Sequence, residues 1–443
     1  MNKLIIHMFY ILFFVLPAKA QETWTVNRCI RYALENNTAH RNYQLNVKRE
    51  KLTAAQSKFD LLPSVSASSG GGMSYGKSVD QNNDYTNTEH FSASGRIGAN
   101  LVLFEGFSRL NRMAYARFRL RAAELDRINH EDDLAFAILE SYYDIVFYTG
   151  MVQIAKDQIE ISNYNLKKTQ AQVEIGLQAK SDLLQMQASL EKERLEFLLA
   201  QNRVEELKYN LWEKMNYKIE QGNGFEINHH TPNVNENIDP VSDSLFFEFA
   251  VVSPLLKKSE ADRLAAEKNV AITKGQNLPS LSLNASMGSG YYETDIGNTG
   301  NIVPLKDQID KNMSKYIGAS LSIPIFGRNQ QRTKVKQAII NKEQAQNNYD
   351  RQKQQLYYEV ANNTRELRAL RAKCNQIQKK LTANEMAYEV ALKKYAEGLI
   401  NIIELLTVKE QLADSKSELL LAGIQYEIKS RMIDFYKGER FWK

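Results

Sequence analysis

The chain has 443 residues, of which 25% are charged, and its formal net charge is +5. This surplus is small and its Lys and Arg are interspersed with acids, so the charge does not favour nucleic-acid binding. The two cysteines, Cys29 and Cys374, could form one disulfide. We expect them to stay unpaired, because Cys374 falls on an apolar helical face where a small buried side chain is typical.

The first 20 residues have the pattern of a secretory signal peptide. Lys3 precedes an apolar run over residues 4–16, and Ala18-Lys19-Ala20 supplies the small-residue ending. Cleavage after Ala20 would leave Gln21 first, without the cysteine that lipid anchoring of a new terminus needs. No later stretch approaches the roughly 18 consecutive apolar residues of a membrane-spanning helix.

Two pairs of β-strands are predicted, and each pair begins directly after a proline. In each strand, apolar and polar residues alternate, which is typical of a strand with one apolar and one polar face. Four segments follow this pattern: 64–75, 90–104, 280–291 and 316–326. The segments between paired strands, 77–89 and 293–312, are rich in Asn and Asp and are expected to be exposed loops.

Four such strands cannot stand alone in a membrane, because their edges would leave backbone groups without partners. Closed barrels begin at about eight strands, so the chain must combine with copies of itself. Three copies would give twelve strands and two copies would give eight, and both remain open at this point. A pair of soluble hairpins on a core is the alternative.

Long helical hairpins follow the strands. No proline occurs in 105–175 or 327–397, and about 70 helical residues span roughly 105 Å. Apolar residues recur at seven-residue spacing on both sides of Gly176 and of Gly398. Glycine allows a helix to end in a left-handed turn, so each copy is predicted to be a helical hairpin with its tip at this glycine.

The second half of the sequence repeats the first. The tip glycines and the second strands recur at an offset of 222 residues, and the first strands recur at 216. This duplication predicts a pseudo-symmetric pair of large units. The predicted organisation is a signal peptide at 1–20, a first repeat at 21–215, a connector at 216–242, a second repeat at 243–435 and a C-terminal tail at 436–443.

Several short motifs follow one another along the chain, and those at the strand entries, strand exits and tips occur in both repeats. The motifs are Trp24-Thr25-Val26, Ala33-Leu34-Glu35-Asn36-Asn37, Leu62-Pro63-Ser64, Leu278-Pro279-Ser280, Leu103-Phe104-Glu105-Gly106, Ile325-Phe326-Gly327, Gly176-Leu177 and Gly398-Leu399. In this order they resemble TolC-type outer membrane efflux proteins, and the resemblance covers essentially the whole mature sequence.

The resemblance implies a mixed α/β membrane protein whose four strands join a trimeric 12-stranded transmembrane β-barrel in the outer membrane. A long antiparallel α-helical barrel continues it into the periplasm. The family forms channels of tripartite efflux or type I secretion systems, with a periplasmic adaptor and an inner-membrane pump of the RND or ABC type. The cargo is drugs, metal ions or proteins. The resemblance implies no enzyme activity, no cofactor and no metal site.

Two other classes of protein remain as alternatives. A periplasmic adaptor or scaffold also pairs coiled-coil hairpins with β-structure, but two copies of each element and strands with a lipid-ready face are not typical of it. An exported enzyme is disfavoured, because no catalytic triad, metal cluster or paired carboxylates occur at usable spacing.

The candidate site residues lie at the helical tips. Asp182 and Glu404 are equivalent under the 222-residue offset, and in the family acids at this point ring the periplasmic entrance. Thr407 stands where a second acid is frequent, and Tyr395 could hydrogen-bond Asp182. By the same resemblance, the tip turns and the adaptor docking surface comprise Gly176, Leu177, Gly398 and Leu399. The alternative reading is that Asn401 to Glu404 forms a capping box and both acids merely favour a helix N-terminus.

Overall fold

A computed structural model of the chain describes residues 23–79, 83–218, 225–228, 245–295 and 301–442. The predicted signal peptide and most of the predicted connector lie outside these residues. The chain divides into two compact units, 1–43 with 127–253 and 353–443, and 44–126 with 254–352. Each unit draws on both sequence repeats, so the repeats are not separate domains in space.

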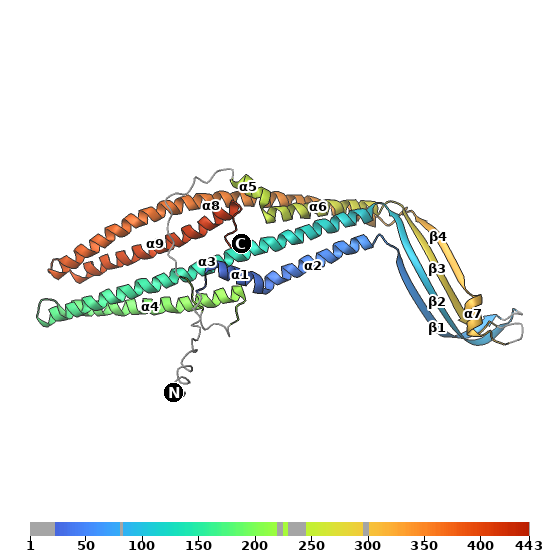
Figure 1. The fold of residues 1–443 in the computed structure, drawn as a ribbon, viewed down its shortest axis with the longest axis horizontal. Coiled ribbons are helices and arrows are strands. Elements are labelled where there is room, and N and C mark those ends of the chain that lie inside the picture. The colour runs from blue at the N-terminus through green and yellow to red at the C-terminus, as the bar shows by residue number, and fades with distance from the viewer. Residues whose placement is uncertain (1–22, 80–82, 219–224, 229–244, 296–300, 443) are drawn as a thin grey trace, which may run out of the picture. The chain divides into compact units, whose positions relative to one another are not determined.

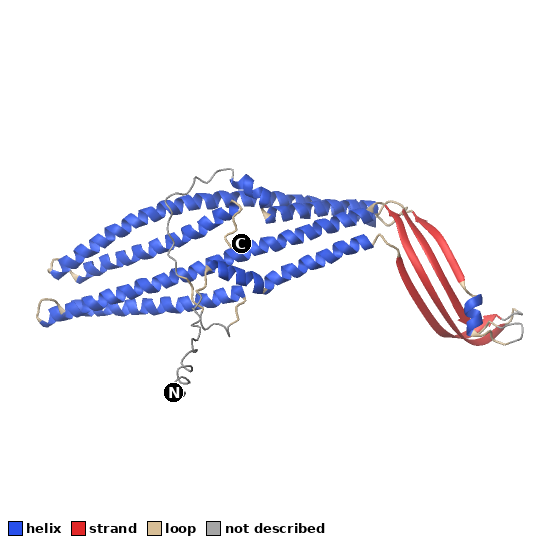
Figure 2. Ribbon diagram, viewed as in Figure 1, coloured by secondary structure: helices blue, strands red, loops and turns tan. Residues whose placement is uncertain are grey.

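The second unit contains a four-stranded antiparallel sheet with strands in the order β1-β2-β3-β4 (Figure 1). The strands are β1 (Ser64–Val79), β2 (Tyr85–Glu105), β3 (Ser280–Tyr292) and β4 (Ser314–Ser322). Strands thus form at the four positions that the alternating pattern predicts, and Figure 2 shows them as one block of sheet. The outer edges of β1 and β4 have no strand partner among the described residues.

The two hairpins have the same internal register. Ser64 pairs with Asn100 in the first, and the equivalent residues Ser280 and Ser322 pair in the second. Between the hairpins, β2 pairs with β3 through Asn100 and Asn284, whose side chains form a hydrogen bond of 2.7 Å. A β-bulge between Val102 and Phe104 interrupts this second ladder, as is common near strand ends.

Three sequence predictions in this unit are wrong. Most of the predicted exposed loop 77–89 is paired strand, since β1 continues to Val79 and β2 begins at Tyr85. The fourth strand ends at Ser322 rather than at residue 326, because Pro324 has no N–H to donate to a ladder. The predicted exposed loop 293–312 contains a helix, α7 (Leu305–Lys311). Its buried Gln308 fixes it to the end of β3 by accepting from the backbone N–H of Tyr292 at 2.8 Å and donating to the carbonyl of Tyr292 at 3.0 Å.

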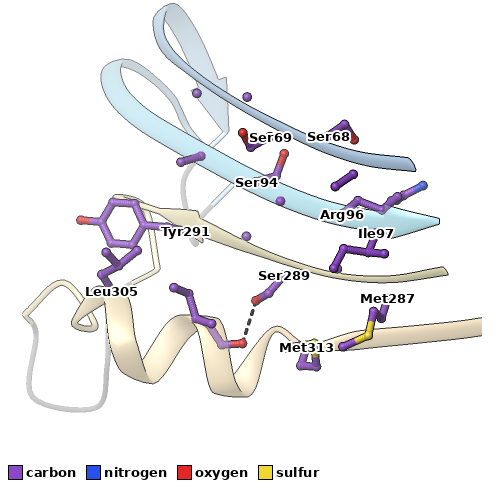
Figure 3. A pocket seen from close by; sticks show the side chains of 18 of the residues that line it. Ser68, Ser69, Ser94, Arg96, Ile97, Met287, Ser289, Tyr291, Leu305 and Met313 are labelled. Carbon is purple, nitrogen blue, oxygen red and sulfur yellow. Dashed lines mark hydrogen bonds between the residues drawn. The ribbon is translucent and has the colours of Figure 1, made fainter. Parts of the chain in front are cut away.

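Helix α7 lies over the apolar face of the sheet and leaves a groove of about 870 Å³ (Figure 3). Ile97 and Met287 line it from the strands, and Leu305 and Met313 line it from α7 and its flank. The hydroxyl of Ser289 donates to the carbonyl of Ile309 at 2.7 Å and holds the helix against β3. The apolar face is therefore partly covered near the β3–β4 loop.

The helices are dominated by two long ones of 67 residues each, which rise about 100 Å along their axes. They have the lengths that the proline-free stretches predict. The helices besides α7 are α1 (Val26–Asn36), α2 (Thr38–Phe59), α3 (Ser108–Glu174), α4 (Lys180–Met215), α5 (Leu245–Val252), α6 (Pro254–Gly275), α8 (Gln330–Ala396) and α9 (Ile402–Tyr436). None of the helices in the described part of the chain has the length and apolarity that crossing a membrane requires.

The chain passes from strand to long helix through the same backbone conformation in both repeats. Gly106 and Phe107 have φ of 54° and 62°, and the equivalent Arg328 and Asn329 have φ of 51° and 63°. At Gly106 the backbone also touches Gly275 at the end of α6, so closely that a Cβ would overlap the Gly275 carbonyl. The glycine is therefore required by a close approach as well as by its φ.

The hydrophobic core of the first unit contains residues of α1, α3 and α4. It also contains Phe225 and Ile227 from the predicted connector and Trp442 from the predicted C-terminal tail. Trp24 forms a parallel bridge with Ile227. Trp442 is 2% exposed, and Arg440 binds Asp132 at 2.9 Å, so residues of the predicted C-terminal tail are packed. Cys29 and Cys374 are free and buried, as expected, and burial raises the pKa of the Cys29 thiol to about 12.

Candidate functional site at the helical tips

Both helical hairpins turn at the glycine that the sequence predicts. Gly176 has a φ of 78°, and the N–H of Leu177 donates to the carbonyl of Gln172 at 2.8 Å. Gly398 has a φ of 72°, and Leu399 bonds Lys394 in the same way at 2.9 Å. This is the Schellman arrangement, in which a left-handed residue closes the last carbonyls of a helix.

The tips present apolar side chains to solvent. Leu177 is 70% exposed and Leu399 is 67% exposed. Leucine is among the residue types most often buried in folded proteins. Ile175 and Ile403 are exposed beside them. Each tip therefore exposes one leucine and one isoleucine.

The two predicted acids differ in their surroundings. Glu404 is exposed in the first turn of α9, where its backbone N–H donates to Asn401 Oδ1 at 2.9 Å and its carboxylate accepts from Asn401 Nδ2 at 3.1 Å. Asp182 lies in the first turn of α4, whose N-cap Ala179 makes no side-chain bond, and accepts from Ser181 at 3.2 Å. Both acids face a helix N-terminus, and Glu404 also belongs to an Asn401 cap.

Tyr395 and Asp182, for which the sequence suggests a hydrogen bond, each have another partner in the structure. The Tyr395 hydroxyl lies 3.5 Å from Thr169 Oγ1 instead, because the ring is buried against α3, where Thr169 is also buried. One turn further from the tip, Asn165 donates to the Tyr388 hydroxyl at 3.4 Å. Burial raises the pKa of Tyr395, Thr169 opposes this, and the negative charge of Asp182 adds to it.

A buried charged cluster behind the tips was not predicted. Lys409 on α9 is 4% exposed and Glu193 on α4 is 8% exposed, and Lys409 Nζ lies 2.6 Å from Glu193 Oε1. Lys409 also donates to Ser162 Oγ and to the carbonyl of Gln158, both on α3. Ser189 and Ser162 donate to the same carboxylate oxygen at 3.2 and 3.0 Å. The cluster joins three helices from both hairpins.

Part of this cluster recurs in the second hairpin. Asn384 and Ser415 are equivalent to Ser162 and Glu193, and Asn384 Nδ2 donates to Ser415 Oγ at 2.6 Å. The charged pair itself has no such counterpart, since Gln187 stands where the repeat would place Lys409. Within the described residues, no group of three or more His, Cys, Asp or Glu side chains could hold a metal ion.

One signal in the sequence points to this cluster. Lys409 lies four residues after Leu405 and three before Leu412, on the face that carries the heptad stripe. Glu193 lies three residues after Leu190 and four before Phe197, so it too falls between two apolar residues of its own stripe. A charge at a seam position requires a buried partner, but the pattern of one helix does not show on which other helix the partner lies.

Comparison with known proteins agrees with this architecture. A sequence profile of the outer membrane efflux protein family matches residues 29–212 and 249–439. The chain is 21% identical to the outer membrane efflux protein BepC of Brucella suis biovar 1 (strain 1330) over 418 residues, which cover 92% of this chain and 84% of BepC.

Solved structures show the same fold. The CmeC outer membrane channel of Campylobacter jejuni superimposes with a TM-score of 0.81 and 16% identity, over 93% of this chain and 85% of CmeC. The outer membrane protein VceC of Vibrio cholerae gives a TM-score of 0.80 and 16% identity, over 92% and 95% of the two chains. The resemblance noted from sequence motifs is confirmed, and the chain belongs to the outer membrane efflux protein family.

Proposed function

We propose that this chain is the outer-membrane channel of a tripartite efflux or type I secretion assembly, and that it acts as a homotrimer. The observation that carries the proposal is the sheet, whose two outer edges have no strand partner in the described parts of the chain. Strands with one apolar and one polar face suit a barrel wall between lipid and water. Because free edges are costly in lipid, the sheet must close with other copies of itself.

The tips support the second half of the proposal. Exposed leucines on two equivalent turns offer a docking surface to a periplasmic adaptor, which connects the channel to an inner-membrane pump. Asp182 and Glu404 lie beside these turns, where three copies would bring six carboxylates to the periplasmic entrance. The channel is a passive exit path, so it needs no catalytic group of its own.

Mass measurement in detergent tests the assembly. The mature chain, beginning at Gln21, is expected to be extracted from membranes by detergent rather than by salt, and to have the mass of three chains. In planar bilayers the purified protein is expected to conduct ions. A monodisperse monomer or dimer would contradict the trimer, and release by salt alone would favour a periplasmic adaptor or scaffold without its own pore.

A further inference from the structure

We propose a specific register for the contact between copies: β4 of one chain pairs antiparallel with β1 of the next, with Ser322 opposite the partner's Ser68. The inference rests on the proposed homotrimer and adds the residue pairing of its barrel seam. It uses only the duplication within the chain and the strand pairs that the structure contains.

The first step is that the repeats are equivalent at the level of single strand pairs. Residues of β1 correspond to β3 at an offset of 216, and residues of β2 correspond to β4 at 222. Applied to the pair Ser64 and Asn100, these offsets give Ser280 and Ser322, which is the pairing observed. The duplication therefore preserves register as well as strand order.

The second step applies the observed pairing of β2 with β3 to the contact between two copies of the chain. Strand β2 of the first repeat pairs with β3 of the second, so the same relation carries β4 onto β1 of the next copy. The pair Asn100 and Asn284 then becomes Ser322 and the partner's Ser68. In the same way, Ala99 and Ala285 become Leu321 and the partner's Ser69, and Gly98 and Ser286 become Ser320 and the partner's Gly70.

The transferred register keeps the two faces of the sheet continuous. Ile317, on the apolar face of β4, falls opposite the partner's Met73, which belongs to the apolar face of β1. Ser320 and the partner's Gly70 fall on the polar face. A slip of one residue would place apolar side chains of one strand beside the polar face of the other.

The sequence that follows β4 also agrees with the transferred register. The bulge in the β2–β3 ladder begins at Val102, whose equivalent in the second repeat is Pro324. Proline is tolerated at bulges, where a ladder hydrogen bond is already missing. Beyond the bulge, Phe104 and Leu281 correspond to Phe326 and the partner's Val65, so pairing with a neighbour can resume after the proline that ends β4 in the single chain.

The equivalence between the contact of the two repeats and the contact of two chains does not extend to the helices. The close contact of Gly106 with Gly275 would become a contact of Arg328 with the partner's Phe59, and these side chains are too large for it. The register is thus proposed for the strands alone.

Disulfide trapping tests the pairing. In a background carrying Cys29→Ala and Cys374→Ala, Ser320→Cys is combined with Gly70→Cys on the polar face, and Leu321→Cys with Ser69→Cys on the apolar face. A Cβ at Gly70 meets no atom within 4 Å, so the substitution is tolerated. In one chain, β1 and β4 are three strand spacings or roughly 14 Å apart, too far for an internal disulfide. Both faces are used because the non-hydrogen-bonded face brings side chains closer.

The controls are pairs slipped by two residues, which keep both faces: Ser320 with Ser68 or with Gly72, and Leu321 with Ala67 or with Gly71. After oxidation, the yield of covalent dimers and trimers is measured on a non-reducing gel. Of the two pairs in the proposed register, the one that crosslinks more is expected to give a yield at least about five-fold above that of its slipped controls, because disulfides require Cα atoms within about 7 Å. The native mass of each variant is measured in parallel, and Ile317 with Met73 replaces a pair that disturbs assembly.

Preferential trapping of a slipped pair would overturn the register. A trimer by mass without trapping at any matched pair would overturn the β4–β1 seam and leave the proposed function standing. A monomer by mass in the parent protein would instead contradict the proposed function.

Discussion

Lys409 Nζ lies 2.6 Å from Glu193 Oε1, and this ion pair connects the two helical hairpins from within. Burial lowers the pKa of Lys409, and the neighbouring Glu193 opposes this shift. The second carboxylate oxygen, Glu193 Oε2, has no donor among the described residues. A buried pair of this kind contributes little net stability but becomes very costly when one partner is removed.

We therefore expect Lys409→Met to destabilise the tips by about 3–5 kcal/mol, and Lys409→Met with Glu193→Met to recover most of this loss. Hydrogen exchange of the α4 and α9 amides measures the local opening free energy. The matched control is Lys192→Met, which removes an exposed ion pair of 2.8 Å with Glu410 between the same two helices and should cost less than about 1 kcal/mol. Equal effects of the two single changes would contradict the role of burial.

The tip glycines provide the second prediction. Replacing Gly176 or Gly398 by Val should disturb the turn and abolish export while membrane insertion continues, since a β-branched residue is strained at φ above 70°. No atom lies within 4 Å of a Cβ built at either glycine, so the strain comes from φ alone. Asn tolerates this conformation and is the matched control. Normal export by both Val variants would remove the functional assignment of the tips.

The third prediction concerns the acids at the tips. Three copies would place up to six carboxylates of Asp182 and Glu404 at one constriction, and charge of one sign there selects permeant ions. Asp182→Asn with Glu404→Gln should therefore weaken cation preference and block by divalent ions in planar-bilayer recordings. Unchanged reversal potential and block would leave the two acids as helix N-terminal charges only, consistent with the Asn401 cap.

The strand-to-helix junctions supply the fourth prediction. Gly106→Ala should reduce the yield of folded protein, because its Cβ would overlap the Gly275 carbonyl at a φ of 54°. Strain and overlap together correspond to about 1–3 kcal/mol or more. Arg328→Ala at the equivalent position is the control, since this residue already has a Cβ at a φ of 51°. Similar trimer yields and melting temperatures for the two variants would contradict the close approach.

The fifth prediction is a pH dependence at His40. Its ring is buried, stacks on His130 with centroids 5.8 Å apart, and has Nε2 3.6 Å from Glu131 Oε1. Burial lowers the pKa of His40 below 6.5, Glu131 opposes this, and His130 and Arg127 reinforce it. Burial thus outweighs the attraction of Glu131, and His40 is neutral at pH 7.

A folded-state pKa below the unfolded value means that the unfolded chain binds the proton more readily. This contribution to stability is complete above pH 6.5 and declines as the pH falls towards the folded-state pKa, with a slope of up to about 1.4 kcal/mol per pH unit. His40→Gln should flatten the decline of the melting temperature below pH 6.5. An unchanged pH profile in this variant would exclude His40 as its source.

Much of the fold could be predicted because its signals are local and repeated. Alternation located the four strands, and Gly176 and Gly398 located the tips. The end of β4 could have been predicted as well, since Pro324 is visible in the sequence. By contrast, α7 is only seven residues long and depends on bonds from Gln308 to Tyr292, which lies 16 positions away. A helix this short has no periodic signal of its own.

The contacts within the candidate site were harder to predict from the sequence, because they too join residues that are distant in the chain. The pairings of Tyr395 with Thr169 and of Lys409 with Glu193 each join residues more than 200 positions apart. Position on a heptad stripe indicates that such a side chain is buried, but the partner depends on how one hairpin is rotated against the other. Three-dimensional contacts decide that rotation, and the pattern of a single helix does not contain it.

The free edge of β1 has a consequence for the order of events in assembly. Its run Ser68-Ser69-Gly70-Gly71-Gly72 carries almost no side-chain volume, so neighbouring pairings that slip by two residues differ little in energy. The side chains of this edge therefore do not determine the register in which β1 pairs with β4 of the next chain. We expect the long helices of neighbouring chains to dock first and to hold β1 and β4 in line, so that closure of the sheet is the last step. Assembly errors would then originate in the docking of the helices, although they would be observed as mispaired strands.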